Sequence, residues 1–573
     1  MKKRKFYDVE HINNMRELLN NTVDKYPQNI AYKFKKYRGK NKFEYVNKTY
    51  SEFKYDVEGL STKLLNMGLE GKKIAVIGNN RYEWCTTYLA VTTGNMIIVP
   101  LDKALPENEL ESLLHRSEAE VVFCDGKYVE KIKKVKEQEE SRLKYIVSFD
   151  ETEENEILIY NEILEQGKKE RLSGNTKYDE IKIDEEKMSI LLFTSGTTST
   201  SKGVMLSQKN ICSNIEDIAS VVKMYPTDTL LSFLPIHHTF ECTITFLYGI
   251  YYGVTVAFCD GIKYIQKNMN EYKVTVFVAV PLVLENIYRK VWKGIDEKGK
   301  TKVMKTMVAI TRGLAKIKID LRKKVFKPVI DQFGGKLRVV FYGAAPMDKK
   351  TILGFNDFGV ELIQGYGLTE TSPVVTAETD REKRPGSIGL PLPNVEVKIY
   401  NPDEEGNGEI LVKGPNVMLG YNKNEEETKK SLKNGWFYTG DYGYIDKDGF
   451  VFMSGRKKDV IVLKNGKNIY PQELEFLINK LPYVEESMVF SRDRNSMDTM
   501  LCAKIVYNKD SAKDLFETED VSKLKEFIWK DIKEINKKLP DVKHIKDIII
   551  TEEPLIKTTT QKVKRYEEIK KIN

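Results

Sequence analysis

Short apolar runs recur along roughly the first two thirds of the chain, and each lies close to a glycine or a proline. The segments between them carry apolar residues at helical spacing. Such runs fit strands that are buried on both faces, and their alternation with helices is typical of largely parallel sheets covered by helices. The pattern therefore predicts an α/β fold with strands in residues 73–78, 96–100, 121–124, 189–193, 276–281 and 337–343.

The pattern changes after about residue 395. Short alternating segments follow, with turns at 403–408, 434–435 and 446–449, and they indicate a smaller β-rich subdomain. Strand and helix patterns with strong charge return from about residue 456. Because domains commonly contain about 100 to 200 residues, we predict a large N-terminal domain over 1–455, built from two α/β sheet subdomains and the β-rich subdomain at about 395–455, and a small C-terminal α+β domain over 456–573.

One segment, residues 298–327, combines an apolar stripe with many basic residues. It contains eleven Lys or Arg residues and one acid, Asp320. Apolar residues recur at steps of three or four, which predicts an amphipathic helix with a basic opposite face. Either this is a surface helix packed on the core, or its basic face contacts anionic lipid or the phosphates of an acidic ligand. The stripe consists of Val303, Met307, Ile310, Leu314, Ile317, Leu321 and Val325.

The overall composition narrows the class of protein. The net charge of +8 comes from 92 basic and 84 acidic residues, an imbalance too small to indicate a nucleic-acid binder. Six cysteines without a C-x-x-C pair indicate neither a disulfide framework nor a zinc site. The basic N-terminus lacks an apolar run behind it, and the uncharged stretch 242–259 fits a buried helix and strand better than a membrane span. We therefore expect a cytoplasmic protein.

A loop rich in hydroxyls and glycine follows the predicted strand at 190–193. It runs from Thr194 to Gly203 and contains Lys202. A loop that leaves the end of such a strand is where α/β sheets bind ligands, and exposed amides, hydroxyls and a lysine suit a phosphate. A Walker loop is not indicated because Lys202 precedes the second glycine. A Ser/Thr-rich surface linker is the alternative.

Six motifs in order decide between these interpretations. Together they resemble the signatures of the adenylate-forming (AMP-binding) enzyme superfamily, and residues 234–241 and 281–326 are similar to segments of its long-chain fatty acyl-CoA synthetases. The resemblance also includes residues 14–19 and 79–102, so it covers nearly the whole chain. The six motifs are residues 193–203, 342–347, 364–371, 438–441, 455–461 and 557–565.

The resemblance implies roles for the residues of these motifs. It places Asp441 and Arg456 at the ribose, Mg²⁺ on Thr194 and Glu370, and Lys562 beside the reacting oxygens, so Lys562, Glu370 and Thr194 are the implied catalytic residues. The implied ligands of the ATP phosphates are Thr194, Ser195, Gly196, Thr197, Thr198 and Lys202. The residues implied for the adenine and its surroundings are Gly343, Ala344, Ala345, Gln364, Gly365, Tyr366, Gly367 and Thr369.

A second reaction step is implied for the C-terminal domain. By resemblance, this domain is mobile and turns about Lys458, so that Lys562 leaves the site and the loop with Gly466 and Lys467 arrives beside coenzyme A. His238 aligns with a histidine that lines the acyl entrance, although a buried core histidine is the alternative.

The expected activity is therefore an AMP-forming long-chain fatty acid:CoA ligase, with a fatty acid, ATP and coenzyme A as substrates. An acyl-ACP synthetase that delivers the acyl group to an acyl carrier protein is one alternative. A non-catalytic, membrane-associated protein that binds nucleotide and acyl groups is another, if Ser199 and Ser201 disable the phosphate loop. If the basic face of residues 298–327 contacts anionic lipid, we expect the protein to bind peripherally to the inner face of the membrane.

Overall fold

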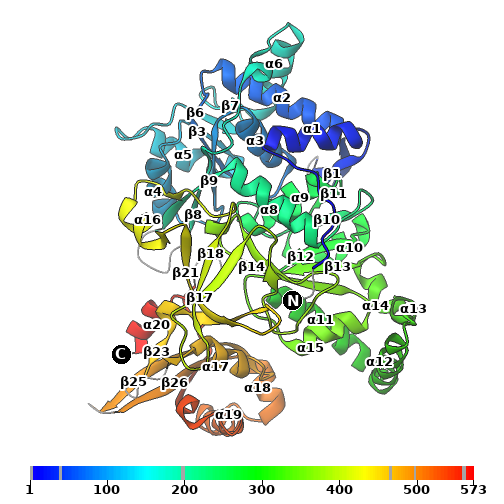
Figure 1. Ribbon diagram of the computed structural model, residues 1–573, viewed down its shortest axis with the longest axis vertical. Coiled ribbons are helices and arrows are strands. Elements are labelled where there is room, and N and C mark those ends of the chain that lie inside the picture. Colours follow the sequence, from blue (N-terminus) through cyan, green and yellow to red (C-terminus); the bar gives the residue numbers. More distant parts are fainter. Residues whose placement is uncertain are drawn as a thin grey trace.

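The computed structural model describes residues 4–37, 42–194, 201–463, 468–495, 498–557 and 563–572. Two helix-covered sheets form the larger part of the molecule, a β-rich part adjoins them, and a smaller α+β part lies at one end (Figure 1). This arrangement confirms the predicted α/β fold with its β subdomain and C-terminal domain. The boundary at residues 455 and 456 stays a prediction.

The first large sheet has the strand order β19-β9-β8-β4-β3-β5-β6-β7. Neighbours from β8 to β7 are parallel, whereas β9 and β19 are antiparallel to their neighbours. The phosphate-loop motif lies between β8 and β9, at the antiparallel edge. The strands are β3 (Lys73–Ile77), β4 (Ile97–Leu101), β5 (Val121–Cys124), β6 (Tyr145–Ser148), β7 (Leu158–Ile159), β8 (Met188–Thr194), β9 (Lys202–Ser207) and β19 (Gly420–Tyr421).

The second large sheet has the order β16-β15-β14-β13-β12-β10-β11-β1-β2. Its central strands, from β14 to β1, are parallel, and both ends are antiparallel. The strands are β1 (Ile30–Tyr37), β2 (Phe43–Thr49), β10 (Thr229–Ser232), β11 (Thr255–Phe258), β12 (Val276–Ala279), β13 (Val339–Tyr342), β14 (Glu361–Gly367), β15 (Val374–Ala377) and β16 (Leu390–Pro391).

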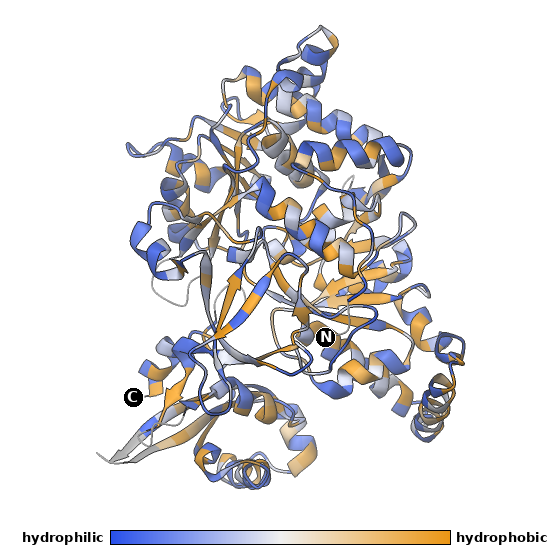
Figure 2. Cartoon of the chain, in the orientation of Figure 1, coloured by the Kyte–Doolittle hydropathy of each residue, from blue (hydrophilic) through white to orange (hydrophobic). Residues whose placement is uncertain are grey.

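The apolar runs of the sequence are the buried strands of these sheets. Every residue of β5, β12 and β13 is buried, as expected of parallel strands covered on both faces. One large cluster of buried apolar side chains joins the two sheets through helices α2 (Tyr50–Asn66), α3 (Tyr82–Thr93) and α8 (Gln208–Val221). Figure 2 shows these strands as apolar and the outer helix faces as hydrophilic.

The β-rich part contains β17 (Glu396–Tyr400), β18 (Gly408–Lys413), β20 (Leu432–Lys433), β21 (Trp436–Ile445) and β22 (Val451–Arg456), in the predicted region. A tight turn joins β20 to β21, and its residues Asn434 and Gly435 have φ values of 52° and 76°. Asn and Gly adopt this left-handed conformation at the lowest steric cost, so this predicted turn is confirmed. The hairpin of β21 and β22 contains Asp441 and Arg456, the two residues implied for the ribose.

The C-terminal part is built on the sheet β25-β26-β27. Helices α17 (Pro471–Ile478) and α19 (Val521–Asn536) pack on it through apolar side chains that include Leu474 and Ile528, both fully buried. The remaining elements are β23 (Ile461–Val462), β24 (Asn468–Ile469), β25 (Val484–Asn495), β26 (Asp498–Tyr507), α18 (Lys509–Phe516), β27 (Ile545–Thr551) and α20 (Arg565–Ile572).

The basic segment differs from the prediction in the length of its helix and in the face that packs. Helix α12 (Thr301–Lys316) ends before Lys318, which has a φ of 63°, so the predicted stripe is not one continuous helix. Met304 and Val308 pack against the core, while Val303, Met307 and Ile310 are exposed. The first interpretation, a surface helix packed on the core, therefore holds for α12, but the packed face lies one residue further along the helix than the predicted stripe. Of the stripe, Val325 packs against the same core.

The uncharged stretch 242–259 folds as predicted, into a buried helical segment followed by β11. Within the described ranges, none of the helices combines the length and the apolar character that crossing a bilayer requires.

Candidate functional site

The phosphate-loop motif is anchored by the hairpin of β8 and β9. The register of this hairpin pairs Thr194 with Lys202, and the Thr194 Oγ1 donates to the Lys202 carbonyl oxygen over 3.4 Å. Both residues are half-buried. The residues implied for the phosphates between them, Ser195 to Thr198, lie outside the described residues. The hairpin thus holds the two ends of the loop beside each other.

Glu370 reaches this hairpin through Tyr421. Glu370 lies in the short helix η5 (Thr369–Thr371), which directly follows β14. The Tyr421 hydroxyl donates to the Glu370 Oε1 over 3.0 Å, and Tyr421 pairs with Val204 where β19 adjoins β9. Burial and the nearby carboxylate raise the pKa of Tyr421, so its hydroxyl keeps its proton. The Glu370 carboxylate and the Thr194 hydroxyl, which the resemblance implies as ligands of Mg²⁺, are hard oxygen ligands of the kind that Mg²⁺ prefers.

The ammonium of Lys202 already has an anionic partner. Its Nζ pairs with the carboxylate of Glu427 on α16 (Glu425–Ser431) and lies 5.0 Å from the centre of the Tyr421 ring. Both side chains of this ion pair are about 30% exposed. A phosphate that binds Lys202 must therefore compete with Glu427.

We predict that Glu427→Gln lowers the Kd for ATP by roughly twofold to fivefold, the range of a partly exposed ion pair. Isothermal titration with ATP measures the change. Glu426→Gln is the matched control, since Glu426 lies on the same helix and pairs with Lys430 over 2.6 Å. A higher Kd in the Glu427 variant alone would show instead that Glu427 positions the lysine for phosphate.

The two motifs implied for the adenine, residues 342–347 and 364–371, begin side by side on the paired strands β13 and β14. These strands pair Tyr342 with Gln364, and the Tyr342 hydroxyl donates to the Gln364 Oε1 over 2.9 Å. A Cβ added at Gly343 would lie 2.7 Å from the Gly365 carbonyl oxygen, so only glycine permits this approach of the two backbones. The structure brings these two motifs together. Thr369 follows in η5, next to Glu370.

The turn after β13 contains a residue in an unusual conformation. Ala344 has a φ of 71°, and both it and Ala345 are exposed. A residue with a Cβ is disfavoured there, and such strain is concentrated at ligand sites. The turn therefore presents a small, preformed edge beside Gln364.

Asp441 is held in a fixed position next to the adenine motifs. Its side chain is fully buried, receives a hydrogen bond of 2.6 Å from the Tyr366 hydroxyl and pairs with the Arg456 Nε at 2.8 Å. Burial and the Asp441 carboxylate raise the pKa of Tyr366, so Tyr366 remains the donor. The register of β21 and β22 places Asp441 opposite Arg456. This network connects the ribose motif to the adenine motif.

His238 lies in the loop before the π-helical segment η2 (Glu241–Leu247). Its ring centre is 4.3 Å from that of the partly buried His237, whose pKa desolvation lowers to about 3. In the same loop, Phe240 approaches Gly343, since a Cβ added there would lie 3.8 Å from the Phe240 Cζ. The segment therefore adjoins the adenine turn, and the role of His238 itself stays a prediction.

A buried carboxyl group, Glu241, begins η2 beside this segment. Ser232 and Thr245 donate to its two oxygens over 2.7 and 3.0 Å. Burial raises the pKa of Glu241 from its ordinary value of 4.5 to about 8. Because the folded state then binds a proton that the unfolded state has lost, stability falls as the pH rises from 4.5 through 8.

We predict that Glu241→Gln removes this loss of stability. The neutral amide keeps the volume of the side chain and can accept from Ser232 and donate to the hydroxyl of Thr245. When the pH rises from 5.5 to 8.5, the Tm of the variant should therefore fall by about 5 °C less than the Tm of wild type. Thermal unfolding at the two pH values measures it. Glu404→Gln, in an exposed turn, is the control. Parallel pH profiles for the Glu241 variant and wild type would contradict the prediction.

The implied hinge residue, Lys458, lies between residues that contact two different parts of the molecule. The Lys457 Nζ pairs with Glu409 of β18 over 2.7 Å, whereas Asp459 accepts from the Gln472 Nε2 of α17 over 2.7 Å. Neighbours of Lys458 thus bind the β-rich part on one side and the C-terminal part on the other. Gly466, Lys467 and Lys562 lie outside the described residues.

Three residues of this site escape sequence reasoning. The partners of Tyr421 and Glu427 lie far away in the chain. The partners of Glu241 lie near it in the chain, one of them inside an uncharged stretch. The only local signal is the position of Glu241 at the end of the motif 234–241.

The chain matches known proteins over nearly its whole length. The family described as AMP-binding enzyme matches residues 19–422, and the AMP-binding enzyme C-terminal domain matches residues 458–572. The fatty acyl-CoA synthetase B of Dictyostelium discoideum is 26% identical, over 92% of this chain and 84% of that protein. The long chain acyl-CoA synthetase 4 of Arabidopsis thaliana is 27% identical, over 86% of this chain and 78% of that protein.

A solved structure has the same fold. The anthranilate CoA ligase AuaEII, in complex with anthranoyl-AMP, superposes with a TM-score of 0.76 at 18% identity and covers 99% of this chain and 98% of that chain. The motifs, their arrangement around Asp441 and Glu370, and a family match over more than half of the residues agree. The chain belongs to the adenylate-forming, AMP-binding enzyme family.

Proposed function

We propose that this protein is an AMP-forming ligase that joins a long-chain fatty acid to coenzyme A. The observation that carries the proposal is that hydrogen bonds connect the motifs implied for the nucleotide. The Tyr421 hydroxyl donates to Glu370 over 3.0 Å, and the Tyr366 hydroxyl donates to Asp441 over 2.6 Å. The names of the relatives, fatty acyl-CoA synthetase and long chain acyl-CoA synthetase, support the fatty acid as substrate and coenzyme A as acceptor.

In the first half-reaction, a carboxylate oxygen of the fatty acid attacks the α-phosphorus of ATP. The bond from that phosphorus to the bridging oxygen breaks, and pyrophosphate leaves with the electron pair. Asp441 would orient the nucleotide through its ribose, and Lys202 would neutralise charge on the β- and γ-phosphates. By resemblance, Lys562 would contact the oxygens of the reacting carboxylate and α-phosphate.

Thr194 and Glu370 would hold a magnesium ion, and their hydroxyl and carboxylate oxygens fit its preference for hard ligands. When bound, Mg²⁺ would withdraw charge from the phosphate oxygens.

In the second half-reaction, the sulfur of coenzyme A attacks the acyl carbon, AMP leaves, and the thiol proton passes to solvent. The C-terminal domain would turn about Lys458 between the two steps, bringing Gly466 and Lys467 to the site. The ion pairs of Lys457 and Asp459 with different parts of the molecule support a pivot at this point.

An acyl carrier protein as acceptor is the second candidate function, because the net charge of +10 over residues 298–327 would suit an acidic partner. The non-catalytic nucleotide and acyl binder remains the third. A cytoplasmic location stays a prediction from the sequence.

The purified protein, incubated with ATP, Mg²⁺ and palmitate and assayed for pyrophosphate with and without coenzyme A, tests the proposal. We expect sustained release that depends on coenzyme A, with palmitoyl-CoA as the product. Release sustained only by acyl carrier protein would favour the second function, whereas nucleotide binding without any pyrophosphate release would favour the third.

A further inference from the structure

Helix α12 lies at the edge of the molecule and uses only part of its surface for packing. It contacts α11 (Pro281–Asp296) and α15 (Lys349–Asp357), and Figure 1 shows it projecting beside α13 (Arg322–Val325). Its inner face contributes Met304 and Val308 to the core and the fully buried Thr311.

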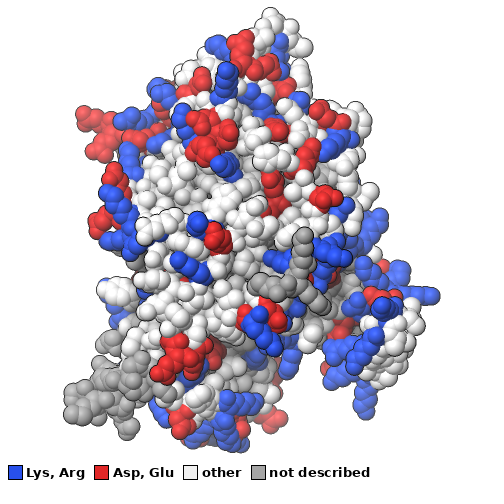
Figure 3. All heavy atoms as spheres, viewed as in Figure 1, with Lys and Arg blue, Asp and Glu red and all other residues white. Residues whose placement is uncertain are grey.

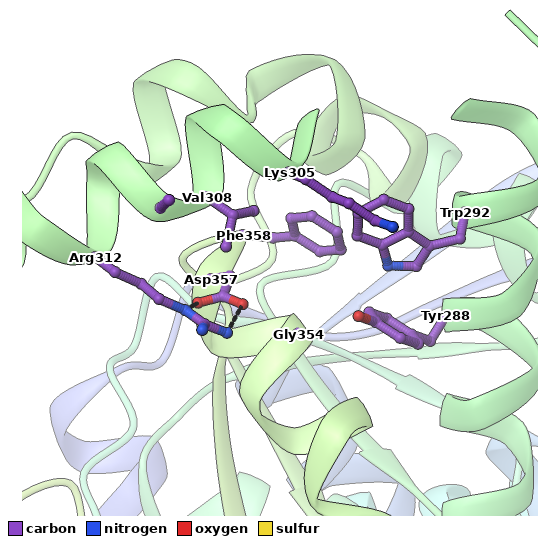
Figure 4. Close-up of a pocket in the computed structure, with 9 residues that line it drawn as sticks. Tyr288, Trp292, Lys305, Val308, Arg312, Gly354, Asp357 and Phe358 are labelled. Atoms are coloured by element: carbon purple, nitrogen blue, oxygen red, sulfur yellow. Dashed lines mark hydrogen bonds and ion pairs between the residues drawn. The ribbon is translucent and has the colours of Figure 1, made fainter. Parts of the chain in front are cut away.

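The inner face of α12 is also fastened by charge. Arg312 donates to both oxygens of Asp357, each over 2.6 Å, and Figure 4 shows this pair beside a cavity of about 290 Å³ that Trp292 and Phe358 line. A bidentate pair and apolar packing fix the rotation of the helix on the body. The opposite face is consequently held outward.

That outward face is apolar. Val303, Met307 and Ile310 follow at steps of four and three and are 59%, 42% and 51% exposed. The turn after the helix continues the surface with Ile317, Ile319 and Leu321, which are 65%, 45% and 39% exposed. Single exposed apolar residues are common, but a group of six on one helix and its adjoining turn marks an interaction site. We name these six side chains the outer face.

Basic side chains border the outer face. Residues 298–327 contain eleven basic residues and one acid, a net charge of +10, and Figure 3 shows blue side chains along the edge of a white surface at this corner. The single acid, Asp320, pairs with Arg322 over 2.7 Å. Within the described residues, no ion pair involves Lys298, Lys300, Lys302, Lys305, Lys316, Lys318, Lys323 or Lys324.

The composition of this surface favours lipid over protein. Protein interfaces are enriched in aromatic residues and depleted of lysine, whereas the outer face is wholly aliphatic apart from one methionine and is bordered by lysines. Helices that lie in a membrane interface combine buried apolar side chains with Lys and Arg at the level of anionic headgroups.

We propose that the outer face docks on an anionic lipid bilayer, with its six apolar side chains in the headgroup boundary and the lysines on the lipid phosphates. This docking does not depend on the ligase reaction, and its test uses no substrate.

Sedimentation with vesicles tests the proposal on the full-length protein. Wild type should bind vesicles in which roughly a third of the lipid is phosphatidylglycerol, bind phosphatidylcholine vesicles far more weakly, and lose binding at high salt. The triple variant Met307→Ser, Ile310→Ser, Ile317→Ser should lose at least tenfold in partition onto anionic vesicles. The control Val521→Ser, Phe527→Ser removes apolar side chains that are 55% and 42% exposed on α19, and it should bind as wild type does.

A second measurement does not depend on losing a contact. Ile310→Trp should show a fluorescence blue shift with anionic vesicles, relative to wild type, because its indole enters the lipid. Equal vesicle binding by the triple variant and wild type, or no blue shift at position 310, would overturn the proposal. Loss of binding to an acidic acyl carrier protein in the triple variant, with vesicle binding intact, would assign the surface to a protein partner instead.

Discussion

The variant Lys562→Ala should form acyl-adenylate about 10² to 10³ times more slowly than wild type, while it converts supplied acyl-adenylate and coenzyme A to thioester at a nearly normal rate. The first half of this expectation follows from charge. The reacting carboxylate and α-phosphate carry negative charge through the transition state, and loss of one well-placed donor commonly costs this factor. The second half follows from the proposed domain rotation, which removes Lys562 before the thiol attacks.

The described residues on either side of position 562 belong to the C-terminal part. Lys557 and Val563 pair across the intervening segment, and Lys557 forms an ion pair with Glu486 of β25 over 2.5 Å. Arg565 pairs with Glu475 of α17. Because both flanks contact this part, the proposed rotation about Lys458 would move them together with it.

ATP–pyrophosphate exchange measures the first half-reaction, and thioester formation from synthetic acyl-adenylate measures the second. Lys564→Ala is the matched control, since Lys564 lies two residues away and pairs with Glu567 at the surface over 3.1 Å. If Lys562→Ala slowed both half-reactions equally in a folded protein, the assignment of Lys562 to one of two poses would be wrong.

The sequence predicts the strands of the large sheets well because each buried parallel strand is a compact apolar run, and β5 and β13 are buried at every residue. The family resemblance, carried by the motifs, implies that motifs far apart in the chain meet, and Tyr342 and Gln364 do pair on the neighbouring strands β13 and β14. The strands depend on local pattern, which a single sequence contains, whereas the grouping of the motifs comes from the resemblance.

The sequence does not predict the partners of the site residues. Glu427 pairs with Lys202 from 225 positions away, and Tyr366 finds Asp441 from 75 positions away. Such pairs depend on how the β-rich part is seated against the sheets, which no periodicity records. The sequence also does not predict which face of helix α12 packs on the core, because the helix has two apolar stripes and hydropathy alone does not tell which one faces the core.

Asp441→Asn should raise the Kd for ATP by about 10² to 10⁴, because its carboxylate is the implied acceptor for two ribose hydroxyls and charge-assisted hydrogen bonds contribute about 1.5 to 3 kcal/mol each. The substitution keeps the shape of the side chain. It removes the negative charge that Arg456 faces at 2.8 Å and that orders the Tyr366 hydroxyl. The ribose would then meet an amide that both donates and accepts, in place of a fixed pair of acceptors.

A comparison of two nucleotides separates this role from a structural one. Wild type should bind ATP far more tightly than 2′,3′-dideoxy-ATP, whereas Asp441→Asn should bind the two with similar Kd values, since the group that distinguishes them has changed. Asp446→Asn is the control in the same hairpin, where Asp446 pairs with Arg384 at the turn. That variant should lose stability but keep the discrimination. If Asp441→Asn weakened both nucleotides in equal proportion, its effect would arise from loosening the buried pair with Arg456, and Asp441 would not be the ribose acceptor.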